Sequence, residues 1–411
     1  MKKGRVIKIS IIVTIVLVLA IWIKSRWKVW FRDLPEPEYV VENKISRLLM
    51  TYGEDGELSR TFTWMCGDTL QPAILELVVL TDTLHFEAEG EIYASRSGKA
   101  AYYRADIASL PQGMSYSYRV LSQTDTIDWY SFTTPYENDQ RKFIYLGDVQ
   151  DDYTGVTPKI FSEIFELYPD VDFYLFGGDI IERPMFGYWD YWFASMQEVS
   201  KTKPILAAAG NHEYLKSFPR HLEDRFGLVF PYASAQNNRG NALLSIKIGE
   251  GQILLLDSNK DFWKYFYQRR WLKNELKNSK AQWQIVTLHH PIYSTKGAFN
   301  QLLQRAFFNP VIKSCGADLV LQGHEHTFMR TSRIDEDSTL QTPVYITSHC
   351  SPKSYKVSYP SDYSKIDNGD KYYQVITYTS DKIVIESYNS SHTQIDMVEV
   401  NPKQVLDINN K

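Results

Sequence analysis

The stretch FIYLGDVQ at residues 143–150 determines the fold class of this chain. Four apolar residues are followed at once by glycine and aspartate, a pattern typical of a buried strand that opens into a loop. Similar apolar runs recur at Phe173–Phe176, Ile253–Leu256 and Gln284–Leu288, and stretches with helical spacing such as Pro158–Tyr168 separate them. This alternation predicts an α/β domain whose central strands are buried on both faces.

Five polar motifs follow apolar runs in this half of the chain. They are Gly147–Asp148–Val149–Gln150, Gly178–Asp179–Ile180–Ile181–Glu182, Gly210–Asn211–His212–Glu213, His289–His290–Pro291 and Gly323–His324–Glu325–His326. In α/β sheets, ligands bind at the carboxyl edge, where strands open into loops. We therefore expect these motifs to meet at one site.

The residue types in the motifs indicate a metal site. Two aspartates, one asparagine and three histidines offer mixed oxygen and nitrogen donors, which suit Mn, Fe or Zn rather than calcium. Two such ions about 3.5–4 Å apart can share a carboxylate and clamp a phosphoryl group. His324 and His326 share one face of an extended segment, so neighbouring metals can each take one imidazole.

These motifs, in this order, resemble those of the calcineurin-like metallophosphoesterases, and within them the purple acid phosphatase-like branch. Asp148, Asp179 and Asn211 are separated by 31 and 32 residues, and the resemblance covers about residues 142–395. It implies a layered α/β/β/α catalytic domain, which we place at residues 138–400. It also implies hydrolysis of phosphate esters with two divalent transition metal ions (Mn, Fe or Zn).

The resemblance assigns roles to seven residues. Asp148 and His326 would hold the first metal, Asp179 would bridge both metals, and Asn211, His289 and His324 would hold the second. His212 would face the phosphate and either stabilise the transition state or assist the leaving group. A hydroxide that bridges the metals would attack phosphorus in line.

Two positions depart from the family pattern. Purple enzymes have a tyrosinate ligand three residues after the bridging aspartate, where this chain has Glu182, so the charge-transfer colour is not expected. Other metallophosphoesterases have histidine where this chain has Gln150. The Gln150 amide can ligate a hard divalent ion or act only as a hydrogen-bonding neighbour. The Asp-x-Gln pattern looks like that of manganese-dependent relatives acting on nucleotide diphosphate compounds, which favours Mn²⁺ or a mixed pair.

Three further residues have alternative interpretations. His290 follows a ligand, so strand alternation sends it to the opposite side unless the loop has begun, in which case it binds substrate. His349 either lines the pocket or packs beside it. Glu182 is a hydrogen-bond acceptor or helix-start residue in one interpretation and a ligand in the other.

The preceding half of the chain predicts an antiparallel β-sandwich at residues 38–137. Seven short segments rich in Thr, Val, Tyr or Trp are separated by turn residues. They are Ile45–Tyr52, Arg60–Cys66, Ala73–Leu80, Leu84–Ala88, Lys99–Ile107, Tyr116–Ser122 and Trp129–Thr134. Trp64 is expected in the core, and Tyr116 or Tyr118 resembles a tyrosine corner. This half looks like the fibronectin-type domain that precedes the catalytic domain in the same branch.

The N-terminal segment, residues 1–32, predicts export. It contains eight basic residues and no acidic one, and it includes the uncharged apolar run Ile9–Ile23. This is either a membrane anchor or a cleaved signal, and in both cases the body is expected outside the cytoplasm. Residues after 32 contain 37 basic and 49 acidic residues, a net charge of −12, which argues against nucleic-acid binding.

The sequence therefore predicts an exported dinuclear phosphoesterase, and the branch that it resembles implies hydrolysis of phosphate monoesters of a small molecule. The membrane is its expected partner through the N-terminal segment, and the pattern assigns no oligomeric state. Phosphodiesterase or nucleotide pyrophosphatase activity is the alternative, because of Gln150. A non-catalytic surface binding protein that kept the fold is less favoured, because all five motifs are intact.

Overall fold

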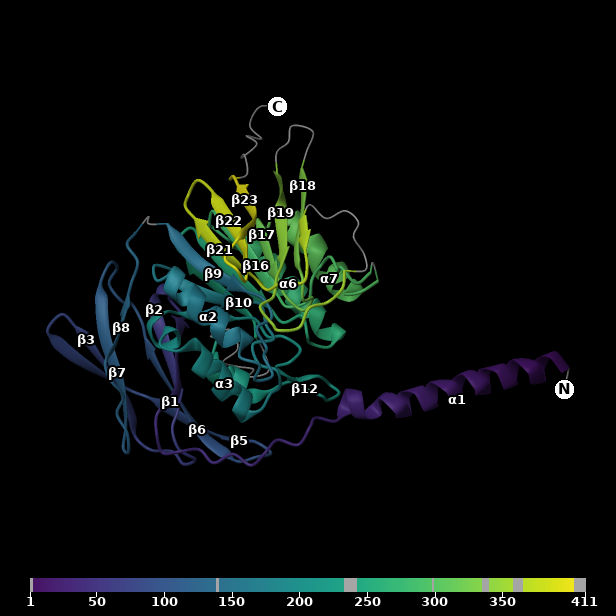
Figure 1. Ribbon diagram of the computed structural model, residues 1–411, viewed down its shortest axis with the longest axis horizontal. Coiled ribbons are helices and arrows are strands. Elements are labelled where there is room, and N and C mark those ends of the chain that lie inside the picture. Colours follow the sequence, from purple (N-terminus) through teal and green to yellow (C-terminus); the bar gives the residue numbers. More distant parts are fainter. Residues whose placement is uncertain are drawn as a thin grey trace.

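The computed structural model describes residues 3–137, 140–232, 242–297, 299–334, 340–357 and 365–402. It consists of a long N-terminal helix, a β-rich part and an α/β part (Figure 1). The predicted boundary at residue 138 lies outside the described residues.

Helix α1 (Lys3–Phe31) projects from the body of the molecule (Figure 1). Its section Ile7–Trp27 has 21 residues, a mean hydropathy of 2.4 and no buried part. At 1.5 Å per residue this section is about 32 Å long, which matches the hydrocarbon core of a bilayer. By length and composition α1 can cross a membrane, and a signal sequence meets the same criterion.

The β-rich part contains two antiparallel four-stranded sheets, in the orders β1-β2-β6-β5 and β4-β3-β7-β8. The strands are β1 (Ser46–Gly53), β2 (Gly56–Met65), β3 (Ala73–Val79), β4 (Asp82–Glu87), β5 (Glu89–Ala94), β6 (Lys99–Ile107), β7 (Ser115–Ser122) and β8 (Tyr130–Thr133). All seven predicted strands are present. Strand β5 was not predicted, because it is a mostly exposed edge strand without an apolar face.

Aromatic side chains form the core of this part. Trp64 is fully buried and stacks on Tyr103 with ring centroids 5.8 Å apart. The hydroxyl of Tyr116 donates to the carbonyl of Pro111 at 3.1 Å, which is the geometry of a tyrosine corner. The hydroxyl of Tyr118 instead donates to the carbonyl of Lys201 in the α/β part, at 2.6 Å. The fibronectin-type assignment stays a prediction.

The α/β part has two large sheets. The first has the order β11-β10-β9-β21-β22-β23 and the second the order β14-β15-β16-β17-β19-β18-β20. The first contains β9 (Arg141–Leu146), β10 (Phe173–Phe176), β11 (Ile205–Ala207), β21 (Tyr372–Tyr378), β22 (Ile383–Asn389) and β23 (Gln394–Val400). The second contains β14 (Leu244–Ile248), β15 (Gly251–Leu256), β16 (Trp283–Leu288), β17 (Leu319–Gln322), β18 (Phe328–Ile334), β19 (Leu340–Thr347) and β20 (Lys365–Asp367).

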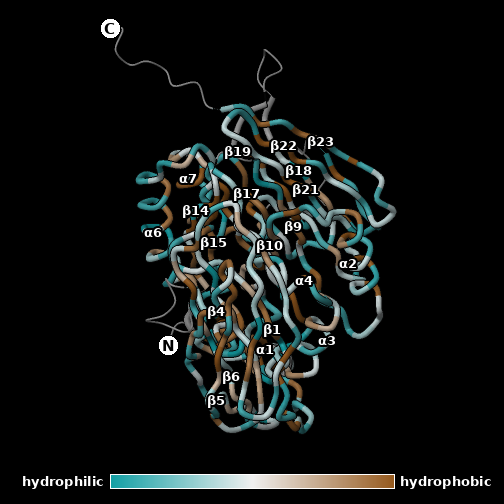
Figure 2. The backbone as a smooth tube through the Cα atoms, turned by 90° about the vertical axis from the view of Figure 1, so that its left-hand side faces the viewer, coloured by the Kyte–Doolittle hydropathy of each residue, from teal (hydrophilic) through white to brown (hydrophobic). Residues whose placement is uncertain are grey.

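Helices cover the outer faces of both sheets, which confirms the layered α/β/β/α fold (Figures 1 and 2). Residues of α2 (Val156–Leu167) and α3 (Phe186–Met196) belong to one core with residues from both faces of the first sheet and from the inner face of the second. Residues of α6 (Tyr265–Asn278) and α7 (Leu302–Ser314) form a separate core with the other face of the second sheet. Central strands such as β9 are therefore buried on both sides.

Several short elements have no clear sequence pattern. The helix α3 ends before a second short helix, α4 (Val199–Thr202), begins, because Gln197 between them adopts a positive φ of 51°. The two-residue strands β12 (Tyr214–Leu215) and β13 (His221–Leu222) and the helix α5 (Asp224–Val229) were not predicted. Elements this short carry too few residues to show a period.

A buried ion-pair network joins the segment before the β-rich part to the α/β part. The Arg225 guanidinium donates to Glu36 at 2.8 Å, to Glu223 at 2.9 Å and to the carbonyl of Pro184 at 2.6 Å. All three charged side chains are almost fully buried. Each carboxylate therefore depends on the guanidinium for compensation.

Replacing Arg225 with methionine is expected to destabilise the protein by about 3–5 kcal/mol, because it leaves buried carboxylates without a partner. Denaturant unfolding of the full chain measures this loss. The matched control is Lys44→Met, which removes an exposed pair with Glu42, and it should leave the unfolding midpoint nearly unchanged. A similar small effect for both variants would contradict the role of Arg225.

Candidate metal centre

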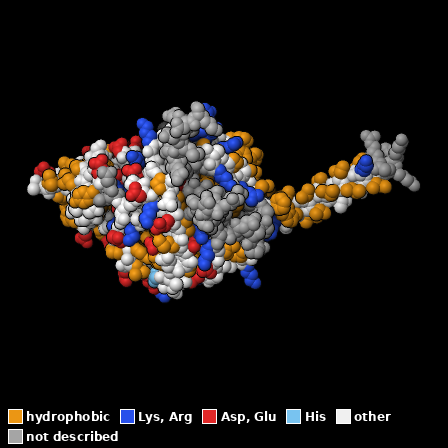
Figure 3. Space-filling view, turned by 90° about the horizontal axis from the view of Figure 1, so that it is seen from above, with side chains coloured by type: hydrophobic (Ala, Val, Ile, Leu, Met, Phe, Trp, Pro, Cys, Tyr) orange, Lys and Arg blue, Asp and Glu red, His pale blue; other side chains and the backbone are white. Residues whose placement is uncertain are grey.

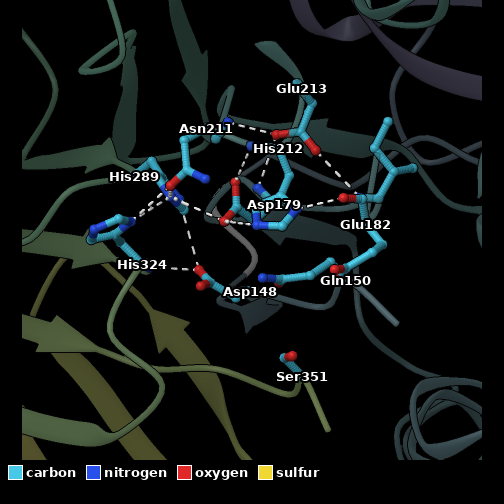
Figure 4. Close-up of polar contacts among 12 residues, drawn as sticks. Asp148, Gln150, Asp179, Glu182, Asn211, His212, Glu213, His289, His324 and Ser351 are labelled. Carbon is cyan, nitrogen blue, oxygen red and sulfur yellow. Dashed lines mark hydrogen bonds and ion pairs between the residues drawn. The ribbon is translucent and has the colours of Figure 1, made fainter. Parts of the chain in front are cut away.

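The five predicted motifs meet at the carboxyl ends of strands from both large sheets. Asp148 follows β9, Asp179 follows β10 and Asn211 follows β11 in the first sheet. His289 and His324 follow β16 and β17 in the second. Figure 4 shows their side chains pointing toward one another, with Asp179 at the centre. The two sheets thus supply the two sides of one polar cluster.

Four donor atoms from this cluster converge. Ligand atoms of Asp179, His289 and His324 all lie within 4.8 Å of one another. The Asn211 amide oxygen lies 2.8 Å from Nδ1 of His324 and 3.2 Å from Nε2 of His289. Nδ1 of His289 is 3.1 Å from the carbonyl of Gly177, to which it can donate, so that Nε2 faces the cluster with its lone pair.

This arrangement fits a transition metal ion. Nδ1 of His324 and Nε2 of His289 are 3.2 Å apart, so at most one of the two atoms can carry a proton between them. The remaining lone pairs and the Asp179 carboxylate face and repel one another. A cation held between them removes this repulsion. Two imidazoles, an amide oxygen and a carboxylate are a donor set that suits Mn, Fe or Zn.

A second set of donors surrounds Asp148. Its Oδ2 lies 2.9 Å from Nε2 of His326, and its Oδ1 accepts the backbone N–H of His324 at 2.6 Å. Nδ1 of His326 lies 3.0 Å from the carbonyl of Lys353, which can accept its proton. Nε2 of His326 is thereby left to face Asp148.

Gln150 lies at the edge of this second set. Its amide nitrogen is 3.4 Å from Nε2 of His326, and its buried amide oxygen has no hydrogen-bond partner among the described residues. Rotating the amide by 180° exchanges the two atoms and turns the oxygen toward His326. A buried oxygen without a donor is a group that a hard cation can satisfy, so Gln150 also fits a metal site.

Burial and charge act against each other on the central side chains. Burial by itself raises the pKa of a carboxyl group, but His289 and its neighbours hold the pKa of Asp148 and of Asp179 below the ordinary value. Burial opposes the charge on His289, yet the carboxylates of Asp179 and Asp148 outweigh it and raise its pKa to about 9. Burial and the nearby His289 lower the pKa of His324 to about 3. The cluster therefore holds its negative charge only together with a positive one.

His212 lies beside Asp179 and reaches solvent. Its backbone N–H donates to Oδ1 of Asp179 at 2.8 Å, and its Nε2 is 3.9 Å from Oδ2. Nδ1 of His212 can donate to the carbonyl of Glu182 at 2.5 Å. The side chain is 26% exposed, so Nε2 can meet a ligand that enters from outside.

One ion pair connects the loops that orient His212 and His326. The ammonium of Lys353 lies 2.7 Å from Oε1 of Glu182. The backbone carbonyls of these same two residues receive the Nδ1 groups of the two histidines. Lys353 was not predicted, because no apolar run or glycine marks its position.

Glu213 joins the Asp179 loop to the Asn211 loop. Its carboxylate accepts the backbone N–H groups of Asp179 at 2.9 Å, Ile180 at 2.8 Å and Gly210 at 2.6 Å. Burial and the charge of Asp179 raise the pKa of Glu213 to about 7. The Glu213 carboxylate therefore holds the backbone of these two loops in place.

Aromatic and imidazole rings pack around the cluster. His290 is 7% exposed, lies 3.0 Å from the hydroxyl of Ser258 and packs its ring 4.4 Å from that of His324. Its substrate-binding role stays a prediction. His349 is fully buried and stacks on His326 at 5.0 Å. Tyr355, which the sequence did not single out, stacks on His326 at 4.3 Å.

Glycines let the ligand loops approach closely. A Cβ at Gly210 would lie 2.1 Å from the backbone nitrogen of Asp179, and a Cβ at Gly323 would lie 2.3 Å from Oδ1 of Asp148. Asp179 and His324 themselves adopt positive φ angles of 51° and 68°, which are uncommon outside glycine. Strained backbone of this kind is typical of functional sites.

Comparison with known proteins agrees with this geometry. Residues 141–328 match the family described as calcineurin-like phosphoesterase. Purple acid phosphatase 18 of Arabidopsis thaliana is 25% identical over 308 residues, which are 71% of this chain and 68% of that protein. Purple acid phosphatase 21 of the same plant is 27% identical over 266 residues, 61% and 58% of the two chains.

Two further similarities are more limited. Phosphoenolpyruvate phosphatase of Allium cepa is 29% identical over 161 residues, which are 36% of this chain and 32% of that protein. The solved structure of PhoD superposes with a TM-score of 0.59 at 12% identity, and the match covers 90% of this chain and 94% of that one. This second similarity shows a shared fold.

Replacing Gly210 with alanine is expected to displace Asp179 and to abolish metal retention, because the added carbon has no space. Metal content of the purified full chain, by inductively coupled plasma mass spectrometry, measures this loss. The matched control is Gly187→Ala, where the added carbon meets only the terminal hydroxyl of Tyr153. Equal metal content in both variants would contradict the close packing of the Asp179 and Gly210 backbones.

Proposed function

We propose that this chain, which contains a calcineurin-like phosphoesterase domain and has purple acid phosphatases among its homologues, hydrolyses phosphate monoesters at a dinuclear metal centre. The domain and its homologues support a hydrolase that acts on phosphate esters. The observation that carries the proposal is the convergence of Asp179, Asn211, His289 and His324 beside the Asp148–His326 pair. Members of the family use a dinuclear metal centre of this kind.

The proposed metal ligands divide into two sets. Asn211, His289 and His324 would hold one ion, Asp148 and His326 with Gln150 would hold the other, and Asp179 would contribute to both. The ions, divalent Mn, Fe or Zn, would supply positive charge to the phosphoryl group and lower the pKa of a water molecule. The Gly177 and Lys353 carbonyls support this division, because each accepts Nδ1 of a histidine and leaves Nε2 for the ion.

His212 is the proposed catalytic residue of the chain itself. The Glu182 carbonyl fixes its Nδ1, so Nε2 is the atom that can donate to a phosphoryl or leaving-group oxygen. Burial lowers the pKa of His212, but the Asp179 carboxylate and the hydrogen bond to the Glu182 carbonyl outweigh it and raise the pKa above the ordinary value. A cationic donor suits an oxygen that gains negative charge.

Monoester hydrolysis is favoured over its alternatives by the homologues that align with most of the chain. Two of these are purple acid phosphatases, and a shorter match is a phosphoenolpyruvate phosphatase, which makes small phosphorylated acids suitable test substrates. Gln150 favours the second candidate, a phosphodiesterase or nucleotide pyrophosphatase, because the Asp-x-Gln pattern resembles that of relatives acting on nucleotide diphosphate compounds. Glu182 stands where a purple enzyme has its tyrosinate ligand, so this chain also departs from the purple pattern.

We further propose that α1 anchors the protein in a membrane with the catalytic domain outside the cytoplasm, or directs its secretion if it is cleaved. The length and apolar character of the section Ile7–Trp27 support this proposal.

The full chain in detergent is expected to hydrolyse p-nitrophenyl phosphate and phosphoenolpyruvate faster than a bis-aryl diester or a nucleoside diphosphate compound. Mn²⁺, Fe²⁺ and Zn²⁺ are added separately. Asp179→Ala should lower the rate by orders of magnitude and reduce bound metal, because the carboxylate is central to both sets of donors.

Asp106→Ala, an exposed aspartate of the β-rich part, is the matched control and should retain metal and rate. A folded, metal-loaded chain that hydrolyses no substrate would exclude the enzyme in favour of a binding protein. Faster diester or pyrophosphate cleavage would favour the second candidate.

His212→Ala is expected to lower kcat for an aryl phosphate by about 10²–10⁴-fold, because it removes a proton donor. Bound metal should stay unchanged, since neither set of donors includes this imidazole. His85→Ala, an exposed histidine in β4, is the control. Loss of metal together with kcat would reassign His212 from catalysis to metal binding.

A further inference from the structure

An exposed aromatic patch lies on the α/β part, formed by Phe218, Phe262, Trp263, Phe266 and Tyr267. These side chains are between 41% and 70% exposed. The Trp263 ring contacts those of Phe218 and Phe262, with centroids 5.8 and 5.3 Å apart. Single exposed apolar residues are ordinary, but a cluster of five large rings indicates a surface that contacts something apolar.

This patch lies next to the end of α1. Asp33, two residues beyond the end of α1, accepts the backbone N–H of Lys216 at 3.2 Å. Arg220 in the same loop donates its backbone N–H to Asp261 at 3.0 Å, immediately before the ring pair 262–263. In Figure 1 the helices α6 and α7 lie on the side of the body from which α1 projects. The patch and the helix thus belong to one face.

The patch is bordered by positive charge on a protein body that is otherwise acidic. Residues 260–280 contain seven basic and two acidic residues, whereas all residues after 32 have a net charge of −12. Lys264, Arg269, Arg270 and Lys273 are exposed on or beside α6. In Figure 3, α1 joins the body at a face where basic and hydrophobic side chains lie together.

We propose that this face rests on the bilayer that α1 enters, with the aromatic patch at the level of the lipid headgroups and the basic residues on anionic lipids. Aromatic side chains such as Trp, Tyr and Phe are favoured in this interfacial region, because it is apolar on the side of the acyl chains and hydrated on the side of the headgroups. Lys and Arg side chains near an anionic leaflet are attracted by its negative surface potential. The proposal goes beyond hydrolysis, since it concerns how the body is oriented.

The positive border favours a membrane over a second copy of this chain. A symmetric dimer through the patch would bring the same basic residues of two copies together, which is unfavourable. An anionic lipid surface, in contrast, complements both the rings and the charges. Because the patch lies beside the end of α1, the membrane that α1 enters would lie next to the patch.

The test uses the full chain with a protease site inserted between Arg32 and Asp33, reconstituted into vesicles of phosphatidylcholine and phosphatidylglycerol at 3:1. Cleavage separates the body from α1 after both have been placed on the membrane, and sedimentation measures the fraction of body that stays bound. We expect most of the cleaved body to sediment with the vesicles at low salt. We expect it to be released from pure phosphatidylcholine vesicles, and from the mixed vesicles at high salt.

The variant Trp263→Ser/Phe266→Ser is expected to release the cleaved body, with at least a tenfold lower bound-to-free ratio. Leu80→Ser/Trp129→Ser removes two exposed apolar side chains from the β-rich part and is the matched control, which should stay bound. Circular dichroism and aryl phosphate hydrolysis verify that both variants are folded and active.

Two results would overturn the proposal. One is release of the unmodified body to the same extent as the patch variant. The other is a released body that sediments as a dimer in analytical ultracentrifugation and becomes monomeric in the patch variant, which would assign the patch to self-association. Neither result depends on the substrate, so the proposed function is tested separately.

Discussion

Two carboxylates buried between two sheets are the constraint around which this molecule is organised. Asp148 and Asp179 are almost inaccessible to water, and an isolated buried carboxylate is costly. The structure offsets that cost with backbone N–H donors and with His289 and His326, and the lone pairs beside them can accept a cation. The proposed metal binding would meet the same electrostatic requirement that keeps these residues ionised.

The position of those carboxylates depends on close backbone packing. Gly210 and Gly323 let loops from different sheets approach to distances that a Cβ would prevent. Glu213 then holds the Asp179 and Gly210 backbones together, while the Glu182–Lys353 ion pair connects the loops that orient His212 and His326. Rigid loops matter here, because a shift of about 1 Å in a catalytic group can reduce a rate by two orders of magnitude.

The parts outside the catalytic domain are joined to it by buried contacts. The Arg225 network fixes the segment that leads from α1, and Tyr118 links the β-rich part to Lys201. The loop that carries Phe218 of the aromatic patch is also connected to the metal centre. In that loop Arg220 donates to the carbonyl of Asn259, and the Asn259 side chain donates to the carbonyl of Ala209 beside Gly210. Hydrogen bonds therefore link the loop of the aromatic patch to the loop of the metal centre, so the proposed membrane contact would also orient the metal centre.

The amino-acid sequence by itself determined the order of the main buried strands and which residues belong to the central cluster. Buried strands such as Phe143–Leu146 are evident because their apolar runs are local, and Asp148, Asp179 and His324 are evident because each follows such a run. Only the tertiary structure decided which atoms meet, that Lys353 pairs with Glu182, and that Tyr355 stacks on His326. These contacts join residues far apart in the chain, and a pairing across 171 positions leaves no local pattern that a sequence could display.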